Sequence, residues 1–98
     1  MTPQQIITTL KSQRDLMHRY SIESISLFGS VVRNEATDES DIDLLVEFNP
    51  DARVSLFQFS RLRRDLSKIL QCNVDLVTPD ALHKDLKADI LKEAVHAA

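Results

Sequence analysis

The stretch that most constrains this chain runs from residue 24 to residue 48, SISLFGSVVRNEATDESDIDLLVEF. One apolar run ends in Gly29 and Ser30, and a second apolar run follows Asp41 and Asp43. Successive side chains of a strand point to opposite faces, so Asp41 and Asp43 are expected on one face, about 7 Å apart. Neighbouring carboxylates beside an apolar strand repel each other and are poorly solvated. A divalent cation such as Mg²⁺ or Mn²⁺ would relieve both problems.

Composition places the chain among ordinary globular proteins. Its 98 residues, 43% hydrophobic and 28% charged, predict one domain over residues 1–98 with a single core. The formal net charge of -3 argues against direct nucleic-acid binding, because a general nucleic-acid binder carries a basic surplus.

The single cysteine, Cys72, cannot form an internal disulfide, and no apolar run approaches membrane-spanning length. We therefore expect a cytoplasmic protein without a membrane partner. The chain also has only one glycine, Gly29, which indicates that this position needs the backbone freedom of glycine.

Hydrophobic spacing and turn signals predict alternating helices and strands. The expected order is a helix over about 3–20, a strand over 24–28, a short helix over 30–35, a polar loop over 36–40, a strand over 41–48, a turn at 49–51, a helix over 56–70, a strand over 73–77 and a last helix from 78 onward. Thr2 with Gln5 and Ser55 with Gln58 are expected capping boxes. The predicted fold class is α/β (α+β), a small mixed β-sheet with helices packed on it.

Three apolar stripes mark the expected core. In the first helix they are Ile6, Ile7, Leu10 and Met17, in the middle one Leu56, Phe59, Leu62, Leu66, Ile69 and Leu70, and in the last one Leu82, Leu86, Ile90 and Ala94 with Leu91 and Val95. The chain end, residues 95–98, is apolar, and either core packing or a contact with a partner explains it.

The acids form one constellation if the second and third strands are neighbours, because Asp75 would then lie beside Asp41 and Asp43. Phosphoryl-type transfer needs metals, charge neutralisation and in-line positioning more than covalent chemistry. Two metal ions about 4 Å apart, held by shared carboxylates, stabilise both the attacking and the leaving oxygens. Gly29 would let the backbone approach a phosphate, and Ser30 with the first amides of the following helix would donate to it.

The spacing resembles the signature of the nucleotidyltransferases of the DNA polymerase β superfamily. That signature is Gly-Ser, ten residues, Asp-x-Asp and a third acid on a later strand; here it is Gly29-Ser30, residues 31–40, Asp41-Ile42-Asp43 and Asp75. The short length, Arg33, SDIDLLVEF and VDLVTPDAL look most like the minimal nucleotidyltransferase (MNT) antitoxins of HEPN–MNT toxin–antitoxin pairs. Asn34 stands where that family commonly has glycine, and asparagine tolerates left-handed geometry.

The resemblance implies a role for each residue of the motif. Asp41 and Asp43 would coordinate Mg²⁺ bound to a nucleoside triphosphate, and Asp75 would bind the catalytic ion of a two-metal site, as ligand alone or also as base. Gly29 and Ser30 would hold the β- and γ-phosphates. Arg33 would add positive charge near the leaving group.

The implied function is Mg²⁺-dependent transfer of AMP from ATP to a tyrosine hydroxyl of a HEPN-domain ribonuclease toxin. The added phosphate would block the toxin electrostatically. Two alternatives stay open: a non-catalytic antitoxin that captures its toxin sterically, and a nucleotidyltransferase subunit with another acceptor.

Other polar residues favour plain structural interpretations. Arg61, Arg63, Arg64 and Lys68 are expected on a solvated helix face, and His18, His83 and His96 on the surface without metal-ligand spacing. Tyr20 is expected to close the packing of the first helix, and Cys72 to be a small buried residue.

Overall fold

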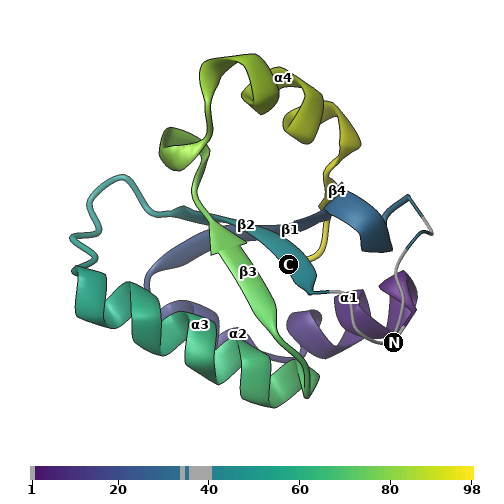
Figure 1. Cartoon of the computed structure of the whole chain (residues 1–98). Coiled ribbons are helices and arrows are strands. Elements are labelled where there is room, and N and C mark those ends of the chain that lie inside the picture. The colour runs from purple at the N-terminus through teal and green to yellow at the C-terminus, as the bar shows by residue number, and fades with distance from the viewer. Residues whose placement is uncertain (1, 34, 36–40) are drawn as a thin grey trace.

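The computed structural model describes residues 2–33, 35 and 41–98, and it contains one four-stranded sheet with helices on both sides (Figure 1). The helices and strands, in chain order, are α1 Pro3–Lys11, α2 Arg14–Arg19, β1 Ile22–Phe28, β2 Ile42–Phe48, α3 Leu56–Leu70, β3 Val74–Val77, α4 Lys84–Glu93 and β4 Val95–His96. Single 3-10 turns at Gly29–Val31 and Pro79–Ala81 follow β1 and β3. The predicted fold class is confirmed.

The strands lie in the order β3-β2-β1-β4. β1 pairs antiparallel with β2 and with β4, and β2 pairs parallel with β3, so the sheet is mixed. A parallel pair needs a crossover connection, which α3 supplies between β2 and β3. The two strands that carry the predicted acids are therefore neighbours, as the sequence reasoning required.

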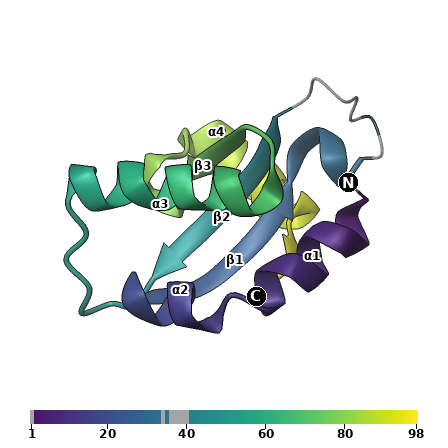
Figure 2. The same cartoon turned by 90° about the horizontal axis from the view of Figure 1, so that it is seen from below.

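One face of the sheet carries the core. Helices α1, α2 and α3 cover this face, and α4 lies on the opposite side of the sheet (Figure 2). The largest fully buried side chains come from α1, α3, β1 and β2, namely Ile6, Leu10, Ile25, Leu27, Leu44, Leu62, Leu66, Leu70 and Val46. Their alternation along β2 leaves Asp43 on the face away from α3.

Both predicted capping boxes are present. The amide of Gln5 donates to the Thr2 hydroxyl at 3.2 Å, and the amide of Gln58 donates to the Ser55 hydroxyl at 3.2 Å. In return each glutamine side chain accepts from the backbone amide of its own capping residue. The beginnings of α1 and α3 were therefore readable from the sequence.

Three predictions about the helices were wrong. The predicted first helix is two helices, α1 and α2, because α1 stops at its C-cap Ser12. The hydroxyl of Ser12 donates to the carbonyl of Thr9 at 2.6 Å. The last helix begins at Lys84, since a 3-10 turn takes up Pro79–Ala81 after the Thr78 cap. The predicted short helix over 30–35 is a three-residue 3-10 turn; Asn34 and the predicted loop 36–40 lie outside the described residues.

The predicted apolar stripes hold in α1 and in most of α3, but they fail at two places. Leu56, the first residue of α3, is 81% exposed. In α4 no residue is buried, and Leu86, Leu91 and Val95 after it are 57%, 44% and 42% exposed. Core packing therefore does not explain the apolar face of the last helix.

The chain end forms an element that the sequence did not predict. β4 adds to the edge of β1, and beyond it the amide of Ala97 donates to the carbonyl of Ile25 at 2.8 Å. Ala97 is fully buried, whereas Val95 is exposed. Of the two explanations for the apolar end, core packing therefore holds for Ala97 and in part for Ala98, but not for Val95. No helix in the described part of the chain is long and apolar enough to cross a membrane.

Tyr20 closes the packing of the first helices, as predicted, and also joins them to α3. It is 8% exposed, and its hydroxyl donates to Asp65 of α3 at 2.8 Å. Burial first, and then the hydrogen bond to Asp65 and the charge of that carboxylate, raise the pKa of Tyr20. The neutral phenol is therefore favoured in the folded chain.

We predict that Tyr20→Phe lowers the free energy of unfolding by about 1 kcal/mol near neutral pH, because a partly buried hydrogen bond is lost. The folded chain holds the Tyr20 proton more tightly than the unfolded chain. Its contribution is therefore complete below the pKa of an unfolded tyrosine, about 10, and is lost as the pH rises above it. Urea unfolding of both chains across this pH range measures the difference.

Ser24→Ala is the matched control, since it removes an exposed hydroxyl bond to Glu47 of 3.3 Å and should change stability far less. A Tyr20→Phe chain as stable as wild type at neutral pH would contradict the prediction. So would a difference in the free energy of unfolding that grows as the pH rises above about 10.

Candidate active site

Strand register brings the predicted residues to one end of the sheet. Asp43 of β2 pairs with Phe28 at the end of β1 on one side and with Asp75 of β3 on the other. Neighbouring strands are about 4.8 Å apart, and paired residues point to the same face, so Asp43 and Asp75 form a side-by-side acid pair. Asp41 lies just before β2, and the amide of Ile42 donates to the carbonyl of Asn73 at 3.0 Å.

Gly29 lies directly against the carboxylate of Asp43. Its φ is +78°, in the region that favours glycine, and a Cβ at this position would overlap Oδ2 of Asp43. Both the backbone conformation and the space therefore require glycine, as its singular occurrence in the sequence suggested. The side chains of Asp41 and Asp75 are exposed, and that of Asp43 is half-buried.

Electrostatics makes Asp43 the strained member of the pair. Burial first, and then the negative charges of Asp75 and Asp41, raise the pKa of Asp43, while the charge of Arg33 lowers it. Ionised Asp43 therefore destabilises the folded chain unless positive charge is added nearby.

Carboxylate oxygens against a backbone without a side chain form a donor set suited to Mg²⁺. Among residues 2–33, 35 and 41–98, however, no three His, Cys, Asp or Glu side chains are grouped closely enough to hold a metal ion. Asp41 is thus not gathered with Asp43 and Asp75 into a ready ligand set. The predicted metal roles remain predictions that fit the donor chemistry of Asp43 and Asp75.

The segment after Gly29 differs from the predicted phosphate cradle in one respect. It is a single 3-10 turn, in which the amides of Val32 and Arg33 donate to the carbonyl of Gly29 at 3.1 and 3.2 Å. Three residues do not build up the dipole of a longer helix. Phosphate binding here would rest on Ser30, individual amides and Arg33.

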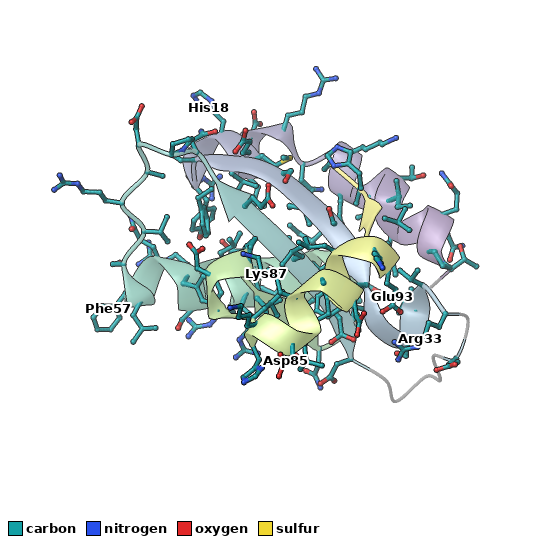
Figure 3. The ribbon with its side chains drawn as sticks, turned by 90° about the horizontal axis from the view of Figure 1, so that it is seen from above. His18, Arg33, Phe57, Asp85, Lys87 and Glu93 are labelled. Carbon is teal, nitrogen blue, oxygen red and sulfur yellow. The ribbon has the colours of Figure 1, made fainter. Side chains whose placement is uncertain are left out.

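Arg33 is fixed by two carboxylates. Its Nε donates to Glu35 at 3.1 Å and its Nη1 donates to Glu93 of α4 at 2.9 Å (Figure 3). These bonds and both negative charges raise the pKa of Arg33. Glu93 is the contact that sequence reasoning missed, and no local signal could have found it, because sixty positions separate it from Arg33.

A hollow of about 740 Å³ lies elsewhere, and none of the six predicted site residues lines it. Its lining comes from the far end of β2, the start of α3 and the 3-10 turn after β3, including Phe48, Leu56, Phe59 and Pro79. Size alone would thus point away from the acids; their register and electrostatics make them the better candidate.

The remaining polar residues lie as predicted. The side chains on the polar face of α3 and the three histidines are all exposed, namely Arg61, Arg63, Arg64, Lys68, His18, His83 and His96. Cys72 is partly buried, and burial raises the pKa of its thiol, which argues against a reactive thiolate.

Comparison with known sequences decides the family. The sequence model of the nucleotidyltransferase domain family matches residues 8–96, nearly the whole chain. The chain belongs to the nucleotidyltransferase family. It is 36% identical over 93 residues to the protein adenylyltransferase MntA of Thermococcus cleftensis, covering 95% of this chain and 90% of MntA. The family predicted from the Gly-Ser and Asp-x-Asp spacing, and the prediction of a nucleotidyltransferase, are confirmed.

Solved structures agree with this fold. A structure provisionally assigned as a minimal nucleotidyltransferase matches with a TM-score of 0.71 and 34% identity, over 91% of this nucleotidyltransferase and 93% of that chain. A complex of a tri-AMPylated Shewanella oneidensis HEPN toxin with an MNT antitoxin matches with a TM-score of 0.67 and 19% identity, over 95% of this chain and 71% of that one. At 19% identity the second likeness shows the fold alone.

We predict that Asp43→Asn raises the thermal unfolding temperature of this nucleotidyltransferase in EDTA near neutral pH, because asparagine keeps the shape without the repelled charge. The folded pKa of Asp43 is raised, so the penalty is absent below the unfolded carboxyl pKa and grows as the pH rises through the folded one. Thermal melts at pH 4 and pH 7.5 check this.

Asp51→Asn, in the exposed turn after β2, is the matched control and should leave the unfolding temperature unchanged. An Asp43→Asn chain that melts below wild type at pH 7.5 would show that ionised Asp43 stabilises the fold, contrary to this account.

Proposed function

We propose that this nucleotidyltransferase, acting as a single domain over residues 1–98, transfers AMP from ATP to a tyrosine hydroxyl of a HEPN-domain ribonuclease and so neutralises it. The observation that carries the proposal is the side-by-side pair of Asp43 and Asp75 against the bare backbone of Gly29. The protein acceptor is supported by the relatives, since MntA is named a protein adenylyltransferase and an AMPylated HEPN toxin occurs with an antitoxin of the same fold.

In the proposed reaction the acceptor oxygen bonds to the α-phosphorus while the bond from that phosphorus to the α,β-bridging oxygen breaks. Pyrophosphate leaves, and the hydroxyl proton passes to Asp75 or to solvent. Bound Mg²⁺ would neutralise the charge that develops on the phosphate oxygens. Asp41, Asp43 and Asp75 would hold two such ions, and their mutual repulsion favours cation binding.

Each residue around the acids has a place in this reaction. Gly29 and Ser30 would hold the β- and γ-phosphates, since the backbone of Gly29 lies directly against the Asp43 carboxylate with no Cβ between them. Arg33 would stabilise the departing pyrophosphate, and its charge already reaches Asp43. The exposure of Asp75 leaves one side of the site open to an acceptor from another chain.

The product explains neutralisation. An AMP group adds a negative phosphate to the toxin, and a ribonuclease must bind the negative phosphates of RNA. Repulsion between the two would block the substrate at the modified site.

We predict that the HEPN-domain chain that co-purifies with this protein acquires label from α-labelled ATP and Mg²⁺, and none from γ-labelled ATP. Asp43→Asn should slow α-labelling at least about a hundredfold, equivalent to the several kcal/mol that metal-ion charge stabilisation supplies. Autoradiography of the separated chains measures both the rate and the acceptor.

Asp51→Asn again serves as the matched control, with full labelling expected. Label from the γ-position would mean a kinase-like reaction and overturn the proposal. No label from either position, with an intact complex and protection by Asp43→Asn, would favour steric capture instead. Label on a molecule other than the HEPN chain would establish a different acceptor.

The exposed apolar residues of α4 and β4 fit contact with that partner. Leu91 and Val95 stand two positions before and two positions after Glu93 in the sequence, and Glu93 contacts Arg33, so a chain docked on them would be near the site. Phe57 is 87% exposed but lies at the other end of the molecule (Figure 3). An acceptor tyrosine must reach Asp75, which favours the α4 side.

We predict that Leu91→Asp weakens binding of the HEPN partner about tenfold or more, because burying one leucine contributes about 1.5–3 kcal/mol. Phe57→Asp is the matched control, an equally drastic change at an apolar residue remote from the site, and should leave binding intact. Surface plasmon resonance with the immobilised partner measures both. The reverse result, with Phe57→Asp the damaging change, would place the partner over α3.

A further inference from the structure

Glu93 lies in the last turn of α4, a helix without a buried residue, yet its carboxylate reaches across to the loop after β1. Its Oε1 accepts from Nη1 of Arg33 at 2.9 Å, and Figure 3 shows the two side chains meeting between α4 and that loop. The Glu93 side chain is only 23% exposed, whereas that of Arg33 is 50% exposed. This is a tertiary contact between two segments of the open face of the sheet.

A second carboxylate holds the same guanidinium from another side. Glu35, two positions along the chain, accepts from Nε at 3.1 Å, but its side chain is 63% exposed. Because Glu35 is only two positions from Arg33, this pair does not connect the guanidinium to another element of the fold. Glu93 belongs to α4 and supplies the fixed point outside the loop.

The position held in this way is close to the acids. The amide of Arg33 donates to the carbonyl of Gly29 at 3.2 Å, and Gly29 lies against the carboxylate of Asp43. The charge of Arg33 lowers the pKa of Asp43, in keeping with this placement. Its contacts with the described residues use two of the five N–H donors of an arginine. No contact with a described residue uses the other donors, so a phosphate can bind there while the bond to Glu93 stays in place.

We propose that Glu93 is a positioning residue for nucleotide binding: it holds the Arg33 guanidinium beside the acid pair, ready to contact the phosphates of the nucleoside triphosphate. The inference rests on the proposed function, in which Arg33 contacts the phosphates. Without Glu93, the long side chain of Arg33 would have to be ordered by the nucleotide itself, and affinity would fall.

Two other roles of Glu93 predict different effects on nucleotide binding, and the test distinguishes them. If Glu93 mainly neutralised Arg33, the carboxylate would compete with phosphate, and its removal would tighten nucleotide binding. If Glu93 only anchored α4, its removal would affect nucleotide binding whether or not Arg33 is present. Positioning alone predicts a loss of affinity that disappears when Arg33 is absent.

The experiment is a double-mutant cycle on the full chain, with Mg²⁺ and AMP-PNP as the probe and isothermal titration calorimetry as the readout. Glu93→Gln should raise Kd about threefold to thirtyfold, within the range of coupling between contacting residues. In the Arg33→Ala background, Glu93→Gln should leave Kd unchanged. Asp89→Asn, which removes the same charge from an exposed position of α4, should leave Kd close to that of wild type.

Glu93→Asp provides a second variant that keeps the charge but shortens the reach, and it should weaken binding as Glu93→Gln does. Circular dichroism establishes that each variant is folded. An unchanged or lower Kd for Glu93→Gln would overturn the inference, and so would equal weakening with and without Arg33.

Failure of the proposed function would give different results from failure of the inference about Glu93. A wild-type chain that binds Mg²⁺ and AMP-PNP, shows the predicted cycle and labels no acceptor would retain the role of Glu93 and lose protein AMPylation. A wild-type chain that binds no nucleotide would overturn both.

Discussion

The repulsion between Asp43 and Asp75 is the constraint on which the site depends. Parallel pairing of β2 with β3 makes these two carboxylates neighbours, and partial burial first, and then the charge of Asp75, raise the pKa of Asp43. A pair of this kind is costly for the folded chain and useful only where positive charge arrives. The rest of the site supplies ways to bring that charge in: a glycine backbone in direct contact with the carboxylate, an arginine nearby and an open side.

The fold tolerates the repulsion between the acids because one face of the sheet packs the core and the other face carries the acid pair. Alternation along β2 points Ile42, Leu44 and Val46 into the core under α3 while it points Asp43 away. Because side chains alternate along a strand, the position of the acid pair is tied to the buried core residues of β2. A slip of one residue in the register would turn Asp43 into the core and turn Ile42, Leu44 and Val46 out of it, so the core that stabilises the fold also fixes the geometry of the site.

The strands and the site could be predicted from the sequence where the signal was local. Turn residues, capping boxes and the alternation around Asp43 indicated the order of the elements, and the spacing from Gly29 to Asp41 and Asp43 indicated the family. What failed depended on distant contacts. The break at Ser12 has no proline or glycine to mark it. β4 is only two residues long, Val95–His96, and it forms because the edge of β1 offers unpaired backbone groups.

The last helix shows why its apolar pattern misled. Leu86 and Leu91 have helical spacing, which fits a core face as well as a face that a partner covers, and only tertiary structure tells the two apart. In this chain α4 is held at its ends, by the turn after β3 and by β4 on β1, and beside its last turn by the bond from Arg33 to Glu93. A helix attached in this way can expose its apolar residues for another molecule to bind, while its last turn stays in place beside the site. Acceptor binding and phosphate binding would then meet at α4, the part of the fold that the sequence predicted least well.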